Sequence, residues 1–493
     1  MATATTEEKI KFVPEQRWAL ASIGLAQLLV LLDMTIISVA LPSAQQSLGM
    51  SDLDRQWALT AYTLVFGGFL LLGGRLADRF DRRNVLVAGV VGLGLASAVG
   101  GLAPSAGLLL AARAAQGACA AVIAPSALSL VSIVFHDRRQ RTRAFGVFSA
   151  IGAGGTALGL VAGGLLTQYA GWRWCLFVNA PLAAAAAVAG RRFVPANGGH
   201  RGIKLNLASA AVGFAAVSTL VYGLSATGNK GLHSPTAYGP LVASVVLLTA
   251  FVVLQRVRAD PLLPIRIVRS RTRGPAYLAV GAAAFGMFAM ILFLTYQLQV
   301  VMGFGPVAAG LAFGPLLGVN ILVTAHLSPR LYRILGARVL LVSGLLVQTV
   351  GILCLTRLSP EASYWTVVLP AEILLGTGAG LILPAVMTTV TARVRPGEVG
   401  VAAAFVTTSQ QIGAALGIAV LDSVATTARE VAGDGLAGTV RGYAVAAWWA
   451  AATLSLIALL VGVMTGAKQM KACAKRTVRG PAAELRSWPN RRN

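Results

Sequence analysis

The chain has 493 residues, of which 56% are hydrophobic and 12% are charged, and its formal net charge is +24. Soluble domains carry about 25% charged residues, so this composition excludes an ordinary soluble protein. Apolar runs of 18 or more residues recur along the whole chain, which indicates a helical protein that crosses a membrane many times. The positive charge lies where short cytoplasmic loops are expected, so no nucleic-acid partner is predicted.

Fourteen membrane spans are predicted, and the loops between them are too short to hold a soluble domain. The spans are 18–41, 57–74, 85–102, 107–131, 144–167, 173–190, 205–225, 238–255, 276–301, 308–327, 339–357, 364–388, 401–424 and 442–466. Of the 41 lysines and arginines, 34 lie in the two tails and in alternate loops, against 6 in the other loops. The positive-inside rule therefore predicts a multi-pass protein of the cell membrane with both termini in the cytoplasm.

The first six and the last six spans resemble each other. Aligning span 107–131 with span 364–388 matches three pairs of residues at one separation of 259 positions. The pairs are Arg113 with Glu372, Gly117 with Gly376, and Pro125 with Pro384. Two parallel six-helix halves around a site near the bilayer midplane predict an all-α membrane protein with the major facilitator fold.

The repeat also predicts the division of the chain into parts. These are an N-terminal six-helix half (1–190), an inserted helix pair with cytoplasmic linkers (191–275), a C-terminal six-helix half (276–466) and a basic cytoplasmic tail (467–493).

Three ionisable side chains in the spans, Asp33, Arg113 and Glu372, are the strongest candidates for function. A charge inside the bilayer costs roughly 2.5–3.5 kcal/mol unless it faces a partner or a water-filled cavity. Asp33 and Arg113 lie at similar depth, and Glu372 holds the equivalent position in the second half. A carboxylate that alternates between an arginine and water can bind and release a proton, so we predict that the three residues couple transport to protons. A static buried ion pair is the alternative.

Other polar side chains within the spans are candidates for lining a substrate cavity, although each could equally form hydrogen bonds between helices. They are Gln27, Gln116, Tyr296, Gln297, Asn320 and Gln410.

Glycines recur every four residues in span 144–167, at Gly155, Gly159 and Gly163, and Gly164 follows. Small residues at this spacing let two helix backbones approach closely. We therefore expect a tight, smooth seam in this span, along which the halves can rock.

The loop that starts at Gly74 places Asp78 among Arg79, Arg82 and Arg83. The positive-inside rule explains the arginines but not the acid. An acid here can cap a neighbouring helix N-terminus and pair with arginine, which predicts a cytoplasmic latch that holds one conformation.

These motifs together resemble the fourteen-span drug:proton antiporters of the major facilitator superfamily. The matching segments are LDMTIISVALP around Asp33, the loop from Gly74 to Arg83, Arg113 with Gln116 and Gly117, the run from Gly155 to Gly164, GWRWCLFVNAP (171–181) and DPLLPIRIV (260–268). The resemblance implies that Arg113 is the proton-coupling arginine and that Asp33 is the acid sharing its cavity. It also implies that Asp78, with Arg79 and Arg82, forms the latch, whereas Glu372 lies outside the family motifs.

Two residues depart from the motifs. Asp81 stands where the loop motif has glycine, and we expect the turn to survive because aspartate tolerates a left-handed backbone. Leu160 stands where the span-five motif has proline, which predicts a weaker bend there.

The leading hypothesis is a proton-coupled antiporter that exports amphipathic small molecules, in particular antibiotics or other drugs, by alternating access. The alternative is a carrier for a nutrient, siderophore or metabolite on the same fold, because a fold does not determine a substrate. No enzymatic activity, cofactor or metal site is expected, since the four cysteines and four histidines are scattered. The expected partners are the substrate, protons and the lipid bilayer, and a monomer is expected.

Overall fold

The computed structural model describes residues 12–135, 137–196, 198, 206–230, 235–257, 266, 270–392, 399–433 and 435–465. Regular secondary structure within these residues is helical, as the composition predicts. The predicted tail at 467–493 and most of the signature at 260–268 lie outside the described residues.

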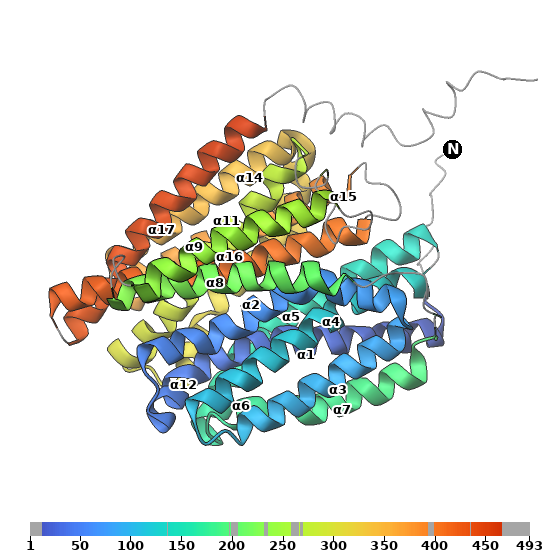
Figure 1. Ribbon diagram of the computed structural model, residues 1–493, viewed down its shortest axis with the longest axis horizontal. Helices are drawn as coiled ribbons and strands as arrows, with labels where there is room; N and C mark the ends of the chain where they lie inside the picture. Colours follow the sequence, from blue (N-terminus) through green and yellow to red (C-terminus); the bar gives the residue numbers. More distant parts are fainter. Residues whose placement is uncertain are drawn as a thin grey trace, which may run out of the picture.

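The N-terminal half contains the helices α1 to α7 (Figure 1). They are α1 (Pro14–Leu48), α2 (Asp52–Arg79), α3 (Arg82–Gly101), α4 (Ala106–Val134), α5 (Arg138–Tyr169), α6 (Trp174–Phe177) and α7 (Asn179–Phe193). The inserted pair follows as α8 (Leu207–Lys230) and α9 (Pro235–Val257).

The C-terminal half is less regular, because three π-helical turns and a break interrupt its helices. Its elements are α11 (Arg273–Tyr296), η1 (Gln297–Val301), α12 (Pro306–Ala312), α13 (Gly314–Leu322), η2 (Val323–Leu327), α14 (Ser328–Leu355), η3 (Tyr364–Val368), α15 (Leu369–Thr391), α16 (Val399–Ala432) and α17 (Leu436–Met464). The predicted span 308–327 is thus built from α12, α13 and η2 rather than from one continuous helix.

The fourteen predicted spans are present in the described part of the chain. By length and hydropathy, twelve described stretches are able to cross a membrane. One of them, Pro306–Leu355, holds two crossings, because Gly336 breaks the helix with a φ of +79°. The helix α5, 32 residues long, provides the remaining crossing.

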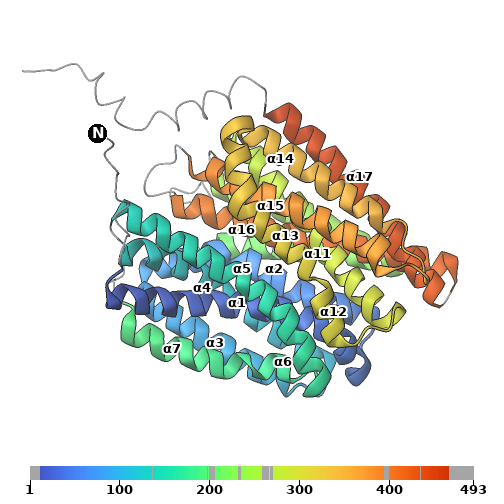
Figure 2. The ribbon, with the colours of Figure 1, turned by 180° about the vertical axis from the view of Figure 1, so that it is seen from behind.

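The two halves meet mainly where α2 packs against α16 and where α5 packs against α12. We call the end of the bundle where α1 begins and α17 ends the near end, and the opposite end, where α1 meets α2, the far end. In Figures 1 and 2, α17 and α7 diverge toward the near end and approach each other toward the far end. The inserted α8 packs against α9, α2 and α16, so it covers the seam between α2 and α16.

Equivalent glycines make equivalent contacts in the two halves, as the repeat predicts. A Cβ atom on Gly117 of α4 would lie 2.5 Å from the carbonyl oxygen of Tyr62 on α2. A Cβ atom on Gly376 of α15 would clash with the carbonyl oxygen of Leu316 on α13. In each half, a glycine therefore lets the backbones of two helices touch: α4 and α2 in the first half, and α15 and α13 in the second.

The glycine row of α5 lies largely inside the first half. A Cβ atom on Gly155 would lie 3.1 Å from the carbonyl oxygen of Leu28, and Gly159 and Gly163 likewise face α1. Gly164 faces the second half, where a Cβ atom would clash with the carbonyl oxygen of Pro306. The tight seam of this row is thus mainly the one between α5 and α1, which differs from the expected seam between the halves.

Leu160 lies within an unbroken α5. Its carbonyl oxygen lies 2.5 Å from the position that a Cβ atom on Gly310 would take, so the backbone of α5 approaches α12 closely here.

We predict that Gly376→Ala destabilises the protein, because the added methyl group meets the backbone of α13. Overpacking of this kind costs about 1–3 kcal/mol. Gly318→Ala on α13 is the matched control, since a Cβ atom there has no neighbour within 4 Å among the described atoms. Thermal unfolding in detergent should show a lower midpoint for Gly376→Ala and an unchanged or higher one for Gly318→Ala. Equal midpoints for both variants would contradict the packing described above.

Candidate functional site

A buried ion pair between Asp33 on α1 and Arg113 on α4 is the centre of the N-terminal half. Arg113 Nη1 lies 3.1 Å from Asp33 Oδ2, and the two side chains are 1% and 0% exposed. The side chains expected to meet in the membrane therefore do meet, and they point into the protein.

Neutral side chains complete the shell around the Asp33 carboxylate. Gln116 Nε2 donates to Asp33 Oδ1 at 2.8 Å, and Asn179 Nδ2 donates to the same oxygen at 2.6 Å. Gln116 also accepts a hydrogen bond of 2.8 Å from Arg113 Nη1 and donates one of 2.7 Å to Ser97 Oγ. A buried charge is stable when it is paired and hydrogen-bonded, and Asp33 meets both conditions.

The helix α2 holds Arg113 from the other side. Arg113 Nε donates to the carbonyl oxygen of Ala58 at 3.1 Å. Its guanidinium carbon lies 4.4 Å from the centre of the Tyr62 ring, at the distance of a cation–π contact. The Tyr62 hydroxyl in turn donates to the carbonyl oxygen of Val30 at 3.1 Å. The guanidinium is thus fixed by α1, α2 and α4 together.

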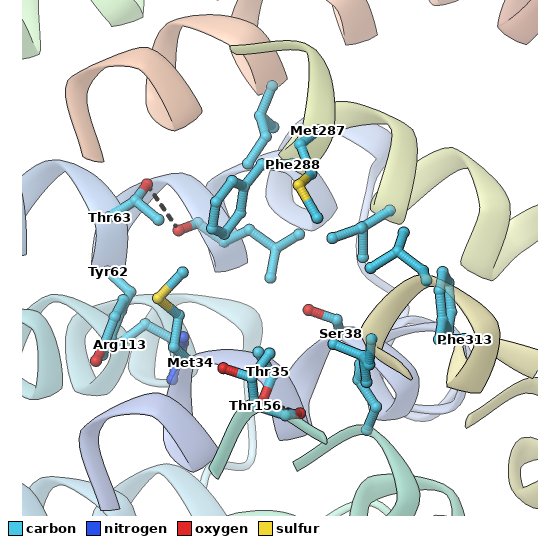
Figure 3. A pocket seen from close by; sticks show the side chains of 16 residues that line it. Met34, Thr35, Ser38, Tyr62, Thr63, Arg113, Thr156, Met287, Phe288 and Phe313 are labelled. Atoms are coloured by element: carbon cyan, nitrogen blue, oxygen red, sulfur yellow. Dashed lines mark hydrogen bonds between the residues drawn. The ribbon is translucent and has the colours of Figure 1, made fainter. Parts of the chain in front are cut away.

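A cavity between the two halves has Arg113 in its wall (Figure 3). Its lining residues are Met34, Thr35, Ser38, Leu59, Tyr62, Thr63, Arg113, Thr156, Leu160, Met287, Phe288, Ile291, Phe313, Leu316, Leu317 and Ile418. The wall is mainly apolar, with two methionines and three aromatic rings. The volume open to water-sized molecules is about 60 Å³, which is room for a few waters. A drug-sized molecule therefore needs the halves to move apart.

None of the six polar residues predicted for a substrate cavity lines the cavity of Figure 3. Gln116 belongs to the shell of Asp33, and Tyr296 donates a hydrogen bond to Gln45 at the far end. Gln297 is buried and donates to the carbonyl oxygen of Ser359 at 3.4 Å. The remaining three, Gln27, Asn320 and Gln410, are half-buried.

Glu372 lies in the second half, fully buried on α15. Its polar neighbours are Tyr364 and the backbone of Leu316. Neither carboxylate oxygen makes a well-formed hydrogen bond with the described residues, because the Tyr364 hydroxyl donates instead to the carbonyl oxygen of Ala312 at 2.8 Å. A buried carboxyl group in this position is stabilised by a proton or by a cation.

The loop between α2 and α3 uses its residues differently from the prediction. Asp81 caps α3, accepting a hydrogen bond of 2.8 Å from the Arg83 backbone N–H. The turn survives as expected, but with an ordinary φ of −66° at Asp81 rather than a left-handed backbone. The side chain of Asp78 lies outside the described residues.

The remaining residues of the expected latch lie at the near end. Arg79 ends α2, and its guanidinium lies 5.8 Å from the centre of the Phe80 ring. Arg82 begins α3. The close backbone contact is made by Gly73, where a Cβ atom would clash with the carbonyl oxygen of Ala121, whereas at Gly74 it would have an ordinary contact of 3.7 Å.

Within the described residues, no group of three or more histidine, cysteine, aspartate or glutamate side chains is placed to hold a metal ion. Cys119, Cys175 and Cys354 are free thiols.

A second buried ion pair was missed by the sequence analysis. Arg55 Nη2 on α2 lies 2.7 Å from Asp422 Oδ1 on α16, with side chains 9% and 4% exposed. The sequence contained a signal, because Asp422 lies inside the predicted span 401–424. Arg55 precedes the span 57–74 and was therefore assigned to a loop. Asn179 and Ser97 were missed too, although Asn179 lies in the signature 171–181.

The chain matches one protein family and is similar to several known proteins. The family model described as Major Facilitator Superfamily matches residues 23–418. The chain is 45% identical over 465 residues to the puromycin resistance protein pur8 of Streptomyces alboniger, covering 92% of each chain. It is 36% identical to the cephamycin export protein CmcT of Amycolatopsis lactamdurans, covering 81% of this chain and 83% of the relative. It is 32% identical to the lincomycin resistance protein of Streptomyces lincolnensis, covering 83% and 84%.

Solved structures share the fold at low sequence identity. The POT family transporter PepTSo superposes with a TM-score of 0.69 at 15% identity, covering 95% of this chain and 99% of that one. The human organic anion transporter MFSD10 gives a TM-score of 0.62 at 16% identity, covering 92% and 100%.

We predict that Asp33 and Arg113 are energetically coupled. Removing one partner of a buried ion pair costs about 3–5 kcal/mol, because the other charge is left without its counterion, whereas replacing both can be close to neutral. Asp33→Leu and Arg113→Met should each lower the unfolding midpoint in detergent more than the double variant does. A double variant whose loss equals the sum of the two single losses would show that the pair is not coupled.

Proposed function

Because the chain belongs to the major facilitator superfamily, we propose that it is a proton-coupled efflux transporter that exports antibiotics or other amphipathic small molecules by alternating access. The observation that carries the proposal is the buried Asp33–Arg113 pair, whose arginine lies in the wall of a mainly apolar cavity between the halves. The resistance and export functions named for the relatives support the direction of transport.

The cavity supports a substrate that is partly apolar and partly polar. Aromatic and sulfur-containing side chains such as Phe288, Phe313 and Met34 adapt to varied apolar shapes, because methionine is flexible and polarisable. Arg113, Thr35 and Thr63 give the same wall a few hydrogen-bonding groups. A hydrophobic pocket with few polar groups is typical of small-molecule sites.

The Asp33 carboxylate is proposed to carry the transported proton. In the described conformation it is held by Arg113, Gln116 and Asn179, which stabilise its charged form. Water that reaches the cavity when the halves part would compete for Arg113 and let Asp33 take up a proton. Substrate binding beside Arg113 and protonation of Asp33 would then act on the same buried ion pair. This links the transport of the substrate to the transport of the proton.

Glu372 is proposed as a second proton-binding group. Its carboxyl is buried without a well-formed hydrogen bond, so binding a proton there removes an uncompensated charge. The helix α15, which carries Glu372, packs against α13, and α13 contributes Leu316 and Leu317 to the cavity. Protonation of Glu372 can therefore affect the wall of the cavity.

The loop charges support an orientation in the membrane. We propose that the near end, with both termini, faces the cytoplasm, and that the protein is a monomer of the plasma membrane. The proton gradient is the proposed source of energy, and neither a cofactor nor an enzymatic step is part of the proposal. The described conformation is then closed toward the outside, because ion pairs and hydrogen bonds between the described residues join the halves at the far end.

We predict that expression in a susceptible host raises resistance to antibiotics such as puromycin or lincomycin, and that a protonophore abolishes the gain. Asp33→Asn and Arg113→Ala should each remove most of the gain, because each breaks the buried ion pair. Arg357→Gln, which removes an exposed arginine, is the matched control. Minimum inhibitory concentrations are compared at equal amounts of protein in the membrane. Full resistance in both variants would rule out the roles assigned to Asp33 and Arg113.

We further predict that Glu372→Gln uncouples the transporter. The amide keeps the shape of the side chain but cannot bind and release a proton in the physiological range. In everted vesicles, drug-induced proton release should fall about tenfold, while drug exchange without a gradient should persist. Glu361→Gln, at an exposed acid, is the control. Normal proton release from Glu372→Gln vesicles would remove Glu372 from the proton pathway.

A further inference from the structure

A cluster of four charged residues joins the halves at the far end. We call Asp52 and Arg55 of α2, with Asp422 and Arg429 of α16, the far-end cluster. Arg55 contacts Asp422 at 2.7 Å and Asp52 at 3.1 Å, and Arg429 contacts Asp52 at 3.2 Å. The Arg55–Asp422 pair is buried, whereas the Asp52 and Arg429 side chains are each 38% exposed. The centre of the cluster is therefore buried, and its rim is partly exposed to solvent.

An aromatic ring covers the centre of the cluster, and further hydrogen bonds join the halves. The guanidinium carbon of Arg55 lies 4.9 Å from the centre of the Tyr296 ring, which comes from α11 in the second half. The Tyr296 hydroxyl donates to the Gln45 side-chain oxygen on α1, in the first half. Gln299 Nε2 donates to the carbonyl oxygen of Val39 at 2.9 Å, again between the halves.

The inserted helix α8 shields the cluster on the side of the seam. Gln56, next to Arg55, donates to Ser225 Oγ on α8 at 3.0 Å. Ser423, next to Asp422, donates to the carbonyl oxygen of Leu224 on α8 at 3.2 Å. The residues that follow both members of the ion pair are thus bonded to the same helix. This surrounding protein keeps water from the pair and strengthens its attraction.

The two buried ion pairs differ in what a movement of the halves does to them. Asp33 and Arg113 both belong to the first half, so a rigid-body rotation leaves their distance unchanged. Arg55 and Asp422 belong to different halves, so any separation of the far ends breaks their contact. The closed far end cannot open while this pair is intact.

We propose that Arg55 and Asp422 form the outer gate of the transport cycle, acting as positioning residues that set the balance between the closed and the open far end. Breaking the pair exposes both charges to water, which compensates for the lost contact, so the gate opens and closes reversibly. The assignment of the gate to the outer face rests on the proposed orientation and function.

The test measures the far-end distance directly. Spin labels on cysteines at the exposed positions Gln46 and Glu361, one in each half, report the distance by pulsed electron resonance in the full chain. The background lacks the native cysteines and must retain drug export. Asp422→Asn removes the buried counterion that Arg55 finds on the other half and leaves only the half-exposed Asp52 of its own helix. The ratio of the long to the short distance should therefore rise about tenfold or more.

Three further variants make the result decisive. Arg429→Gln breaks the exposed rim contact between the halves and should change the ratio less than twofold, because exposed ion pairs contribute little. The charge exchange Arg55→Asp with Asp422→Arg should restore the short distance. If that protein does not fold, the apolar pair Arg55→Leu with Asp422→Leu should restore the short distance instead. An unchanged ratio in Asp422→Asn, or an equal change in Arg429→Gln, would overturn the gate.

The outcome separates the gate from the proposed function. The distance is measured without substrate, so failure of drug export leaves the gate test intact. Labelling of Gln46→Cys in whole cells by a membrane-impermeant maleimide reports which face the far end occupies. Labelling in everted vesicles but not in whole cells would overturn the outer assignment.

Discussion

The contact between the Asp33 carboxylate and the Arg113 guanidinium is the constraint on which the first half depends. Hydrocarbon offers no water to either charge, so the protein supplies every partner. The helices α1, α2, α3, α4 and α7 each contribute a group to this network, through Asp33, Ala58, Ser97, Gln116 and Asn179. The second half has the same backbone plan with Glu372 at the position of Arg113. The two halves are therefore alike in shape and different in charge.

Much of this arrangement could be predicted because the bilayer restricts which residues a membrane span can contain. An ionisable residue in an apolar span is rare and needs a reason, so Asp33, Arg113 and Glu372 stood out. Paired glycines such as Gly117 and Gly376 were visible because the close backbone contact admits no larger side chain. The apolar runs gave the number of spans, including the crossing that Gly336 separates from its neighbour.

The features that escaped prediction depend on how the halves meet. Arg55 precedes an apolar run and resembles an ordinary loop charge until α16 brings Asp422 to it. The polar residues expected in the cavity could not be placed, because composition does not tell which face of a helix turns inward. Asp81 was read as a substitute for glycine, whereas its side chain caps α3 at an ordinary backbone angle.

Because α8 covers only one of the two main contacts between the halves, the two flanks of the molecule differ in thickness. On one flank, α8 and α9 lie between the hydrocarbon and the contact of α2 with α16. On the other flank, where α5 meets α12, Leu158, Leu165 and Leu311 are themselves exposed, as the surface of a lipid-facing wall should be. A compound dissolved in the acyl chains meets two-layered protein on the first flank and a single layer on the second. The two flanks of the bundle therefore present walls of different thickness to the bilayer.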